Sequence, residues 1–200
     1  MNNSALFKIG YGLYVLSSRE GDRDNACIVN TVAQVTAAPC RITVAVNKQN
    51  FTHDMIMRSR LFNASVLTEE TPFDIFRQYG YQSGKDTDKF QGQKFARSEN
   101  GLIYLPDVSN AWISGKVSDV IDLGTHSLFL ADLTDAEVLS EVPSVTYDYY
   151  QKKIKPAPPA QKGKGWRCRI CGYVYEGEVL PPDYVCPICK HGAADFERID

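Results

Sequence analysis

The sequence contains no run of apolar residues long enough to cross a membrane. The longest stretch without a charged side chain is Asn25–Cys40, whose 16 residues include the polar Asn30 and Thr31. A membrane-spanning helix needs about 20 mostly apolar residues. The first ten residues also lack the basic and apolar blocks of a secretion signal. We therefore expect a cytoplasmic protein with no membrane partner.

Several common cofactor motifs are also missing. No Gly-x-Gly-x-x-Gly sequence follows a predicted strand, which argues against a Rossmann dinucleotide site. Gly80–Asp86 resembles a P-loop only in part, because three residues instead of four separate its glycines and Asp86 replaces the Ser or Thr that holds magnesium. Only three histidines are present, and none belongs to a Glu-x-x-His sequence. We therefore expect no iron centre of histidines and carboxylates for oxygen chemistry.

Charge is nearly balanced over the whole chain but is unevenly distributed along it. The formal net charge is -2, so no global field steers the protein toward nucleic acid, and we expect no nucleic-acid partner. Residues 1–150 carry a net charge of -5 and residues 166–200 a net charge of -2, whereas residues 151–165 contain five lysines and no acid. A basic segment between two acidic ones predicts two domains, 1–150 and 166–200, joined by a linker.

The composition of the segment 151–165 supports its interpretation as a linker. It contains three prolines, two glycines and five lysines. Such a segment cannot bury enough apolar surface to fold by itself, so we expect a semi-extended tether.

Residues 1–150 have the pattern of a mainly β domain. Two short helices are predicted at 52–60 and 72–79, the first capped by Asn50 or Thr52. Long strands with few helices between them favour a closed antiparallel sheet, although a sandwich fits nearly as well. Tyr147–Tyr150 is expected to form the last strand. The other predicted strands, rich in Val, Ile, Tyr and Thr, are Tyr11–Ser17, Ile28–Thr36, Ile42–Asn47, Phe62–Leu67, Trp112–Val120 and Ser127–Leu133.

Four of the six cysteines form two Cys-x-x-Cys pairs near the C-terminus. They are Cys168 with Cys171 and Cys186 with Cys189. Two such pairs present four thiolates to one metal ion, which suits zinc or iron. A domain of this size cannot be stable through apolar burial alone, so metal binding must supply much of its folding free energy. Disulfide bonds are the alternative, but the spacing favours a metal site.

The residues around these cysteines resemble rubredoxin over 166–200. The similarity lies in Cys-Gly-Tyr-x-Tyr, Pro-Pro-Asp-Tyr-Val-Cys-Pro-x-Cys and a closing Asp-Phe-Glu, with an aromatic frame that includes Trp166 and Phe196. The resemblance implies one iron ion bound by the four cysteines, although a zinc ribbon uses the same spacing. Three features depart from the family pattern: a shorter gap between the pairs, Tyr184 in place of tryptophan, and Lys190 in place of glycine.

Four segments of the larger domain resemble the flavin reductase family. The matching segments are Asn30–Thr36 with Pro39, Asn47–Thr52, Ser83–Phe90 and, more weakly, Gly124–Phe129. In Ser83–Phe90 the chain has Lys85 where the family signature has arginine. The resemblance covers about residues 5–150 and implies an FMN-binding split barrel.

The resemblance also implies roles for individual residues. Thr52 and the helix that starts there are expected to bind the flavin phosphate, with Lys48 and Lys85 adding positive charge. His126 is expected near the nicotinamide as a catalytic residue. Ordinary alternatives exist for each, namely a helix cap, a solvated loop and a turn histidine. The expected cofactor-binding residues are Asn30, Thr31, Val32, Gln34, Asn47, Lys48, Thr52, Lys85, Asp86 and Lys89.

The order of the two domains resembles that of the high-molecular-weight rubredoxins. This resemblance implies that NAD(P)H reduces FMN, which passes electrons singly to the Fe(Cys)4 centre. It further implies a flavodiiron oxygen or nitric oxide reductase as the external acceptor, and a homodimer. One alternative is a flavin reductase barrel with a structural zinc ribbon that docks onto a protein or nucleic acid. Another is a barrel that binds flavin without NAD(P)H turnover.

Overall fold

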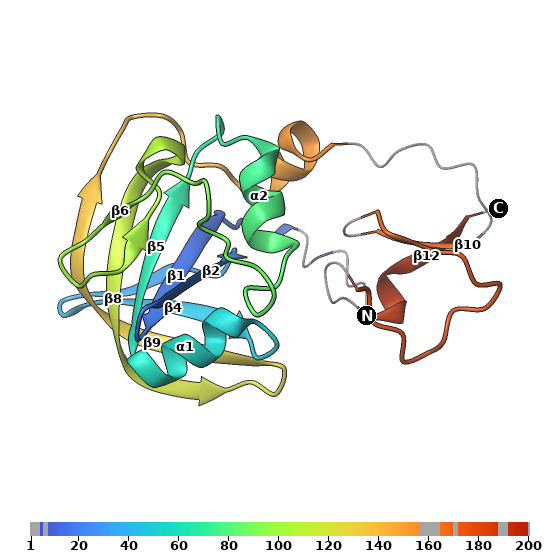
Figure 1. Cartoon of the computed structure of the whole chain (residues 1–200), viewed down its shortest axis with the longest axis horizontal. Helices are drawn as coiled ribbons and strands as arrows, with labels where there is room; N and C mark the ends of the chain where they lie inside the picture. Colours follow the sequence, from blue (N-terminus) through green and yellow to red (C-terminus); the bar gives the residue numbers. More distant parts are fainter. Residues whose placement is uncertain (1–4, 6–7, 157–164, 170–171, 188–191, 200) are drawn as a thin grey trace. The chain divides into compact units, whose positions relative to one another are not determined.

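The computed structural model describes residues 5, 8–156, 165–169, 172–187 and 192–199 (Figure 1). The chain divides into two compact units, Met1–Lys155 and Pro156–Asp200. No helix in the described part of the chain is long and apolar enough to cross a membrane.

The larger unit is built on one seven-stranded antiparallel sheet that curls around a core (Figure 1). The strand order is β2-β1-β5-β8-β9-β4-β3, so β2 and β3 form its two edges. One sheet with all the long strands confirms the mainly β prediction and favours the barrel over the sandwich. The strands are β1 (Tyr14–Glu20), β2 (Arg23–Val29), β3 (Ala33–Ala37), β4 (Cys40–Asn47), β5 (Leu61–Leu67), β8 (Ser109–Asp122) and β9 (His126–Val138).

The inner face of the curled sheet forms one apolar cluster. Val44 and Val46 of β4 and Phe62 of β5 are fully buried there, together with Phe129 of β9. Cys27 and Val29 of β2 belong to the same cluster, although β2 and β4 are not paired by backbone hydrogen bonds. Side chains of β2, one edge strand, therefore pack against those of β4, which lies next to the other edge strand β3. This gap between β2 and β4, bridged by side chains alone, is the open seam of a split barrel.

Two helices begin and end close to their predicted bounds. Helix α1 (Phe51–Ser59) follows its N-cap Asn50 and ends at Arg60, which has the left-handed conformation. Helix α2 (Phe73–Gly80) follows Pro72. Helix α2 packs with the outer face of β1 in a second apolar cluster. The remaining short elements of this unit are β6 (Ala96–Arg97), β7 (Ile103–Tyr104) and the 3-10 turn η2 (Pro106–Val108).

The predicted strand Ile28–Thr36 is interrupted: its ends lie in β2 and β3, and the prediction is wrong at Asn30–Val32, where the chain passes from one strand to the other. The Thr31 hydroxyl donates to the Ala45 carbonyl at 2.8 Å and accepts from the Ala45 N–H at 3.1 Å. A side chain thus takes the place of a backbone partner on β4. This contact ends the strand at a point where the β-rich sequence continues.

The predicted strand Tyr147–Tyr150 is also wrong. Tyr147–Tyr149 form the short helix α3, and Tyr150–Ile154 continue it as the π-helical turn η3. Thr146 caps this segment by accepting a hydrogen bond from the N–H of Tyr149. The buried Tyr150 ring lies 4.5 Å from Phe76 of α2, centroid to centroid. Packing against α2 therefore overrides the strand preference of tyrosine, and helical structure extends over 151–154 of the expected linker.

The smaller unit contains a three-stranded antiparallel sheet in the order β11-β10-β12. Cys168 ends the middle strand, and Phe196 begins β12 directly opposite it. The strands are β10 (Gly165–Cys168), β11 (Val174–Tyr175) and β12 (Phe196–Ile199), with the 3-10 turn η4 (Ala193–Asp195) before the last.

Gly115 of β8 tests how tightly the barrel core is packed. It lies opposite Phe62 on β5, and a Cβ added to Gly115 would lie 2.5 Å from Phe62 Cζ. We expect Gly115→Ala to lower the free energy of unfolding by about 1–3 kcal/mol, because Phe62 cannot move without disturbing the core. Urea unfolding followed by circular dichroism measures the change. Gly10→Ala is the control, since nothing lies within 4 Å of its added Cβ. Equal stability of the two variants would contradict the prediction.

Candidate functional site

The end of β4 and the start of α1 meet the turn between β8 and β9. Asn47 is the register partner of His126. The Lys48 N–H donates to the Thr125 carbonyl at 3.0 Å, and the Asn50 N–H donates to the Asn47 carbonyl at 3.0 Å. Two of the segments singled out in the sequence, Asn47–Thr52 and Gly124–Phe129, are therefore brought together at one corner.

An ion pair fixes this corner. Lys48 Nζ lies 2.6 Å from Asp122 Oδ1. The hydrogen bond from Lys48 and another from the Gly124 N–H hold the pKa of Asp122 below its usual range. The Lys48 side chain keeps 36% of its area exposed, so its ammonium can also approach an anion from solvent. His126 is half-buried at the same turn, with its Nδ1 2.9 Å from the Thr125 hydroxyl.

The first turn of α1 offers backbone N–H groups to this corner. The Asn50 side chain forms no capping hydrogen bond with the helix. The His53 N–H donates to the Asn50 carbonyl at 3.0 Å, but the N–H groups that precede it at a helix start have no partner within the helix, and they attract anions. The Thr52 side chain, however, is fully buried, and its hydroxyl accepts a hydrogen bond from Asn25 Nδ2 at 2.9 Å. The structure thus turns this hydroxyl into the protein, away from solvent.

His53 follows Thr52 and links α1 to β9. Its side chain is buried, with Nε2 2.9 Å from the Ser127 hydroxyl and Nδ1 3.0 Å from Asp54 Oδ1. Its ring centroid lies 5.6 Å from that of Phe129. Its partner Ser127 lies 74 positions away along the chain, so no local motif identifies this contact.

The turn between β2 and β3 lies at the open seam of the sheet. Thr31 bonds the backbone of Ala45, as described above, and Val32 packs against the inner cluster. Asn30 is half-buried. Gln34 is exposed on edge strand β3, and its amide donates to the Thr36 carbonyl at 3.2 Å. These residues therefore lie on one short stretch of chain beside the seam, and their contact with a flavin ring stays a prediction.

The third segment, Ser83–Phe90, does not bring its expected cofactor-binding residues together. Lys85 and Asp86 are exposed. Lys89 is only 4% exposed, and its ammonium donates to the carbonyls of Ala26 at 2.9 Å and Tyr79 at 3.1 Å. Burial lowers the pKa of Lys89. The Lys89 ammonium, which was expected to contact a cofactor, therefore forms its hydrogen bonds with backbone carbonyls of β2 and α2 instead.

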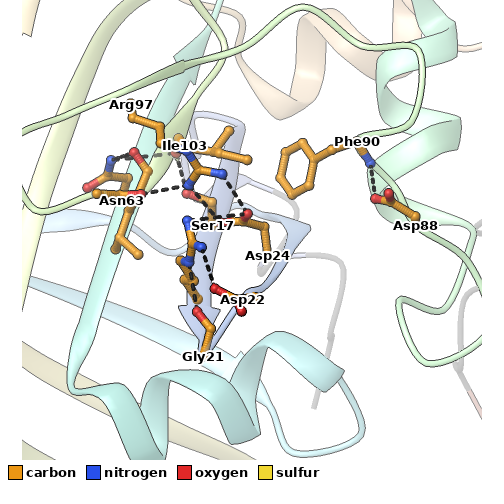
Figure 2. Close-up of polar contacts among 12 residues, drawn as sticks. Ser17, Gly21, Asp22, Asp24, Asn63, Asp88, Phe90, Arg97 and Ile103 are labelled. Carbon is orange, nitrogen blue, oxygen red and sulfur yellow. Dashed lines mark hydrogen bonds and ion pairs between the residues drawn. The ribbon is translucent and has the colours of Figure 1, made fainter.

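A pocket of about 630 Å³ lies between the turn that joins β1 to β2 and this same segment. Figure 2 shows Asp22 and Asp24 on one side, and Asp88 and Phe90 on the other. Asp24 is held by Arg97 through hydrogen bonds of 3.0 and 2.7 Å. None of the expected cofactor-binding residues lines this pocket.

The candidate metal centre lies in the smaller unit. Cys168 and Cys186 are buried thiols in one cluster with Phe196, and Tyr173, Tyr175 and Tyr184 pack around it. Buried sulfur ligands within an aromatic shell suit iron or zinc. Cys171 and Cys189 lie outside the described residues. No three His, Cys, Asp or Glu side chains in the described part of the chain are placed to hold a metal ion.

Backbone hydrogen bonds hold Cys168 in place. The Cys168 N–H donates to the Tyr173 carbonyl at 2.8 Å, and the Gly172 N–H donates to the Cys168 carbonyl at 2.9 Å. The Tyr184 hydroxyl lies 3.3 Å from that of Tyr173, and this hydrogen bond raises the pKa of Tyr184 to about 12. Tyr184 therefore takes the place of the tryptophan that is usual in the family, and its hydroxyl has a hydrogen-bond partner.

Comparisons with known proteins agree with this division. Residues 6–158 match the family model of the flavin reductase like domain, and residues 166–197 match that of the rubrerythrin, rubredoxin-like domain. The chain is 37% identical to the high molecular weight rubredoxin of Moorella thermoacetica, with 100% of both chains covered.

Two further similarities concern the larger unit. The chain is 36% identical to the ferric-chelate reductase (NAD(P)H) of Archaeoglobus fulgidus, over 79% of this chain and 94% of that protein. The crystal structure of an FMN-binding protein from Thermus thermophilus shares the fold, with a TM-score of 0.59 and 24% identity over 66% of this chain and 72% of that one. The predicted split barrel and rubredoxin-like domain are confirmed. The chain belongs to the flavin reductase-like family, and it is an oxidoreductase with a rubredoxin-like domain at its C-terminus.

Proposed function

We propose that this protein passes electrons from NAD(P)H through FMN to a Fe(Cys)4 centre and on to an external redox protein. The observation that carries the proposal is the union, in one chain, of a flavin reductase-like domain and a rubredoxin-like domain with Cys168 and Cys186 in a buried aromatic cluster. Bound flavin accepts the two electrons of a hydride and releases them singly, whereas iron in four thiolates accepts one electron at a time.

The open seam of the larger unit supports a flavin site. The side chains of Asn30 and Gln34 and the backbone groups of Thr31 and Val32 would bind the polar edge of the flavin ring, because Asn30–Val32 lie outside both β2 and β3. Lys48 and the first-turn N–H groups of α1 would hold the phosphate, with Asn47 fixing the strand end. His126 would orient the nicotinamide.

The acceptor and the assembly are parts of the same proposal. A flavodiiron oxygen or nitric oxide reductase fits as acceptor, because the sequence offers no histidine and carboxylate cluster for a di-iron site of its own. We also propose a homodimer in the cytoplasm. The edge strand β3, all five residues of which are exposed, would contact the second copy.

The first test is the reduction of both centres by NAD(P)H without oxygen. We expect NAD(P)H to bleach the flavin absorption and then the visible thiolate-to-iron bands of the purified protein. Cys186→Ser should remove the iron and its bands but leave the flavin bound and reducible, because a rubredoxin centre needs every thiolate. Metal analysis and anaerobic visible spectroscopy measure both.

Cys40→Ser is the matched control, since Cys40 lies on β4 of the larger unit. It should keep the iron and its bands. Colourless protein that contains zinc would favour the docking alternative, and flavin that NAD(P)H does not bleach would favour the alternative without turnover.

A second test concerns the phosphate site. Lys48→Ala should weaken FMN binding far more than riboflavin binding, because only FMN carries the phosphate. A hydrogen bond to a charged group contributes about 1.5–3 kcal/mol, which corresponds to at least about a tenfold loss of affinity. Titration calorimetry with both flavins measures the difference. Asp122→Asn is the control and should keep or strengthen FMN binding, since it removes the carboxylate that competes for Lys48. An equal loss for both flavins would place the phosphate elsewhere.

A third test concerns the linker. Cutting the chain at an inserted protease site within residues 156–164 should leave flavin reduction intact and make iron reduction slow and dependent on concentration. A tether of this length gives an effective concentration in the millimolar range, so its loss at micromolar protein should slow transfer by orders of magnitude. Stopped-flow reduction of intact and cut protein at several concentrations measures this. Identical, concentration-independent rates would show that the two domains stay docked without the tether.

A further inference from the structure

The segment Ser83–Phe90 directs its contacts toward strand β2. Arg23 of β2 donates to the Gly84 carbonyl at 2.5 Å and to the Lys85 carbonyl at 3.2 Å. At the other end of the segment, Lys89 donates to the Ala26 carbonyl of β2. Strand β2 is an edge of the sheet, so these contacts hold a strand that has only one strand neighbour.

Gly84 packs directly against the side chain of Asn25 on β2. An added Cβ at Gly84 would lie 1.9 Å from Asn25 Oδ1 and 2.5 Å from Asn25 Cγ. The Asn25 side chain is only 2% exposed, so it has no room to move aside. Only glycine therefore allows the segment to close over the Asn25 amide, and the segment in turn confines that amide.

The confined residues of β2 hold the start of α1. Asn25 Nδ2 donates to the hydroxyl of Thr52 at 2.9 Å, and this hydroxyl is fully buried. The Arg23 guanidinium lies 4.5 Å from the ring centroid of Phe51. The first two residues of α1 are thus each held by a residue of β2 that Ser83–Phe90 holds in place.

We propose that Ser83–Phe90 positions the first turn of α1 for phosphate recognition and does not itself bind the cofactor. Asn25 is the positioning residue that connects them. This inference rests on the proposed phosphate site at the start of α1. It departs from the role that the family resemblance implies for Lys85, Asp86 and Lys89, because backbone carbonyls already bind the Lys89 ammonium. Lys85 is exposed, so its part is decided by the Lys85→Ala variant below.

The physical reason is that backbone N–H groups cannot adjust their direction as a long side chain can. They bind a phosphate only if the helix start lies at the correct place, and each hydrogen bond lost to the charged phosphate lowers the affinity by about tenfold or more. A clash at Gly84 would move the Asn25 amide, and through it Thr52. The loss should fall on the phosphate and spare the flavin ring.

The experiment compares FMN and riboflavin affinities of the full-length variants. We expect Gly84→Ala to weaken FMN binding at least about tenfold and riboflavin binding by no more than about threefold. Gly10→Ala, with nothing within 4 Å of its added Cβ, is the matched control and should change neither affinity. Lys85→Ala distinguishes positioning from direct contact and should change FMN affinity by no more than about threefold.

Two results would overturn the proposal. One is a loss of FMN preference in Lys85→Ala, which would make Lys85 a ligand. The other is a Gly84→Ala protein that folds and keeps its FMN preference. If Gly84→Ala does not fold, as thermal melting would show, Asn25→Ala replaces it, since it removes the donor to Thr52 without a clash. It should lose the preference, and retention would overturn the proposal. A wild-type protein that binds both flavins equally overturns the phosphate site itself, before any variant is compared.

Discussion

The larger unit depends on side-chain hydrogen bonds that hold strand β2 and the turn after it to neighbouring elements, where no backbone ladder does so. Strands β2 and β3 are the two edges, and no backbone ladder joins β2 to β4. Thr31 instead bonds both backbone groups of Ala45 on β4, and Asn25 of β2 bonds the buried Thr52 of α1. A buried polar group without a partner costs about 1–3 kcal/mol, so each of these contacts specifies one arrangement of the seam.

The sequence predicts the regular parts of the fold because these depend on local patterns. Alternating apolar residues locate β4, β5 and β9, and Asn50 and Pro72 mark the starts of α1 and α2. The errors lie where distant contacts decide. Tyr147–Tyr150 has strand-forming residues, but its packing on α2 makes it helical. The break at Asn30–Val32 depends on Ala45, which lies 14 residues from Thr31.

The candidate sites show the same division. Spacing alone identifies the cysteine pairs, because two Cys-x-x-Cys turns suit one metal ion wherever they occur. Motif similarity also selects segments that do meet in space, such as Asn47–Thr52 and the turn at His126. It could not tell which polar atoms face solvent. Thr52 and Lys89 are both turned inward, and only the positions of Asn25, Ala26 and Tyr79 reveal this.

The seam also explains why a cofactor site can exist in so fully paired a sheet. Inside the sheet, backbone N–H and C=O groups are mostly used by neighbouring strands, so few remain for a ligand. Unpaired backbone groups occur at the turn after β2, along the outer edge of β3 and at the start of α1. The first of these lies at the seam, where Thr31 bonds Ala45 of β4. The side chains that close it must therefore hold β2 and α1 firmly enough to shape a site, yet leave these backbone groups unused. The buried contact of Asn25 with Thr52 does both, because it joins two side chains and uses no backbone group of β2 or α1.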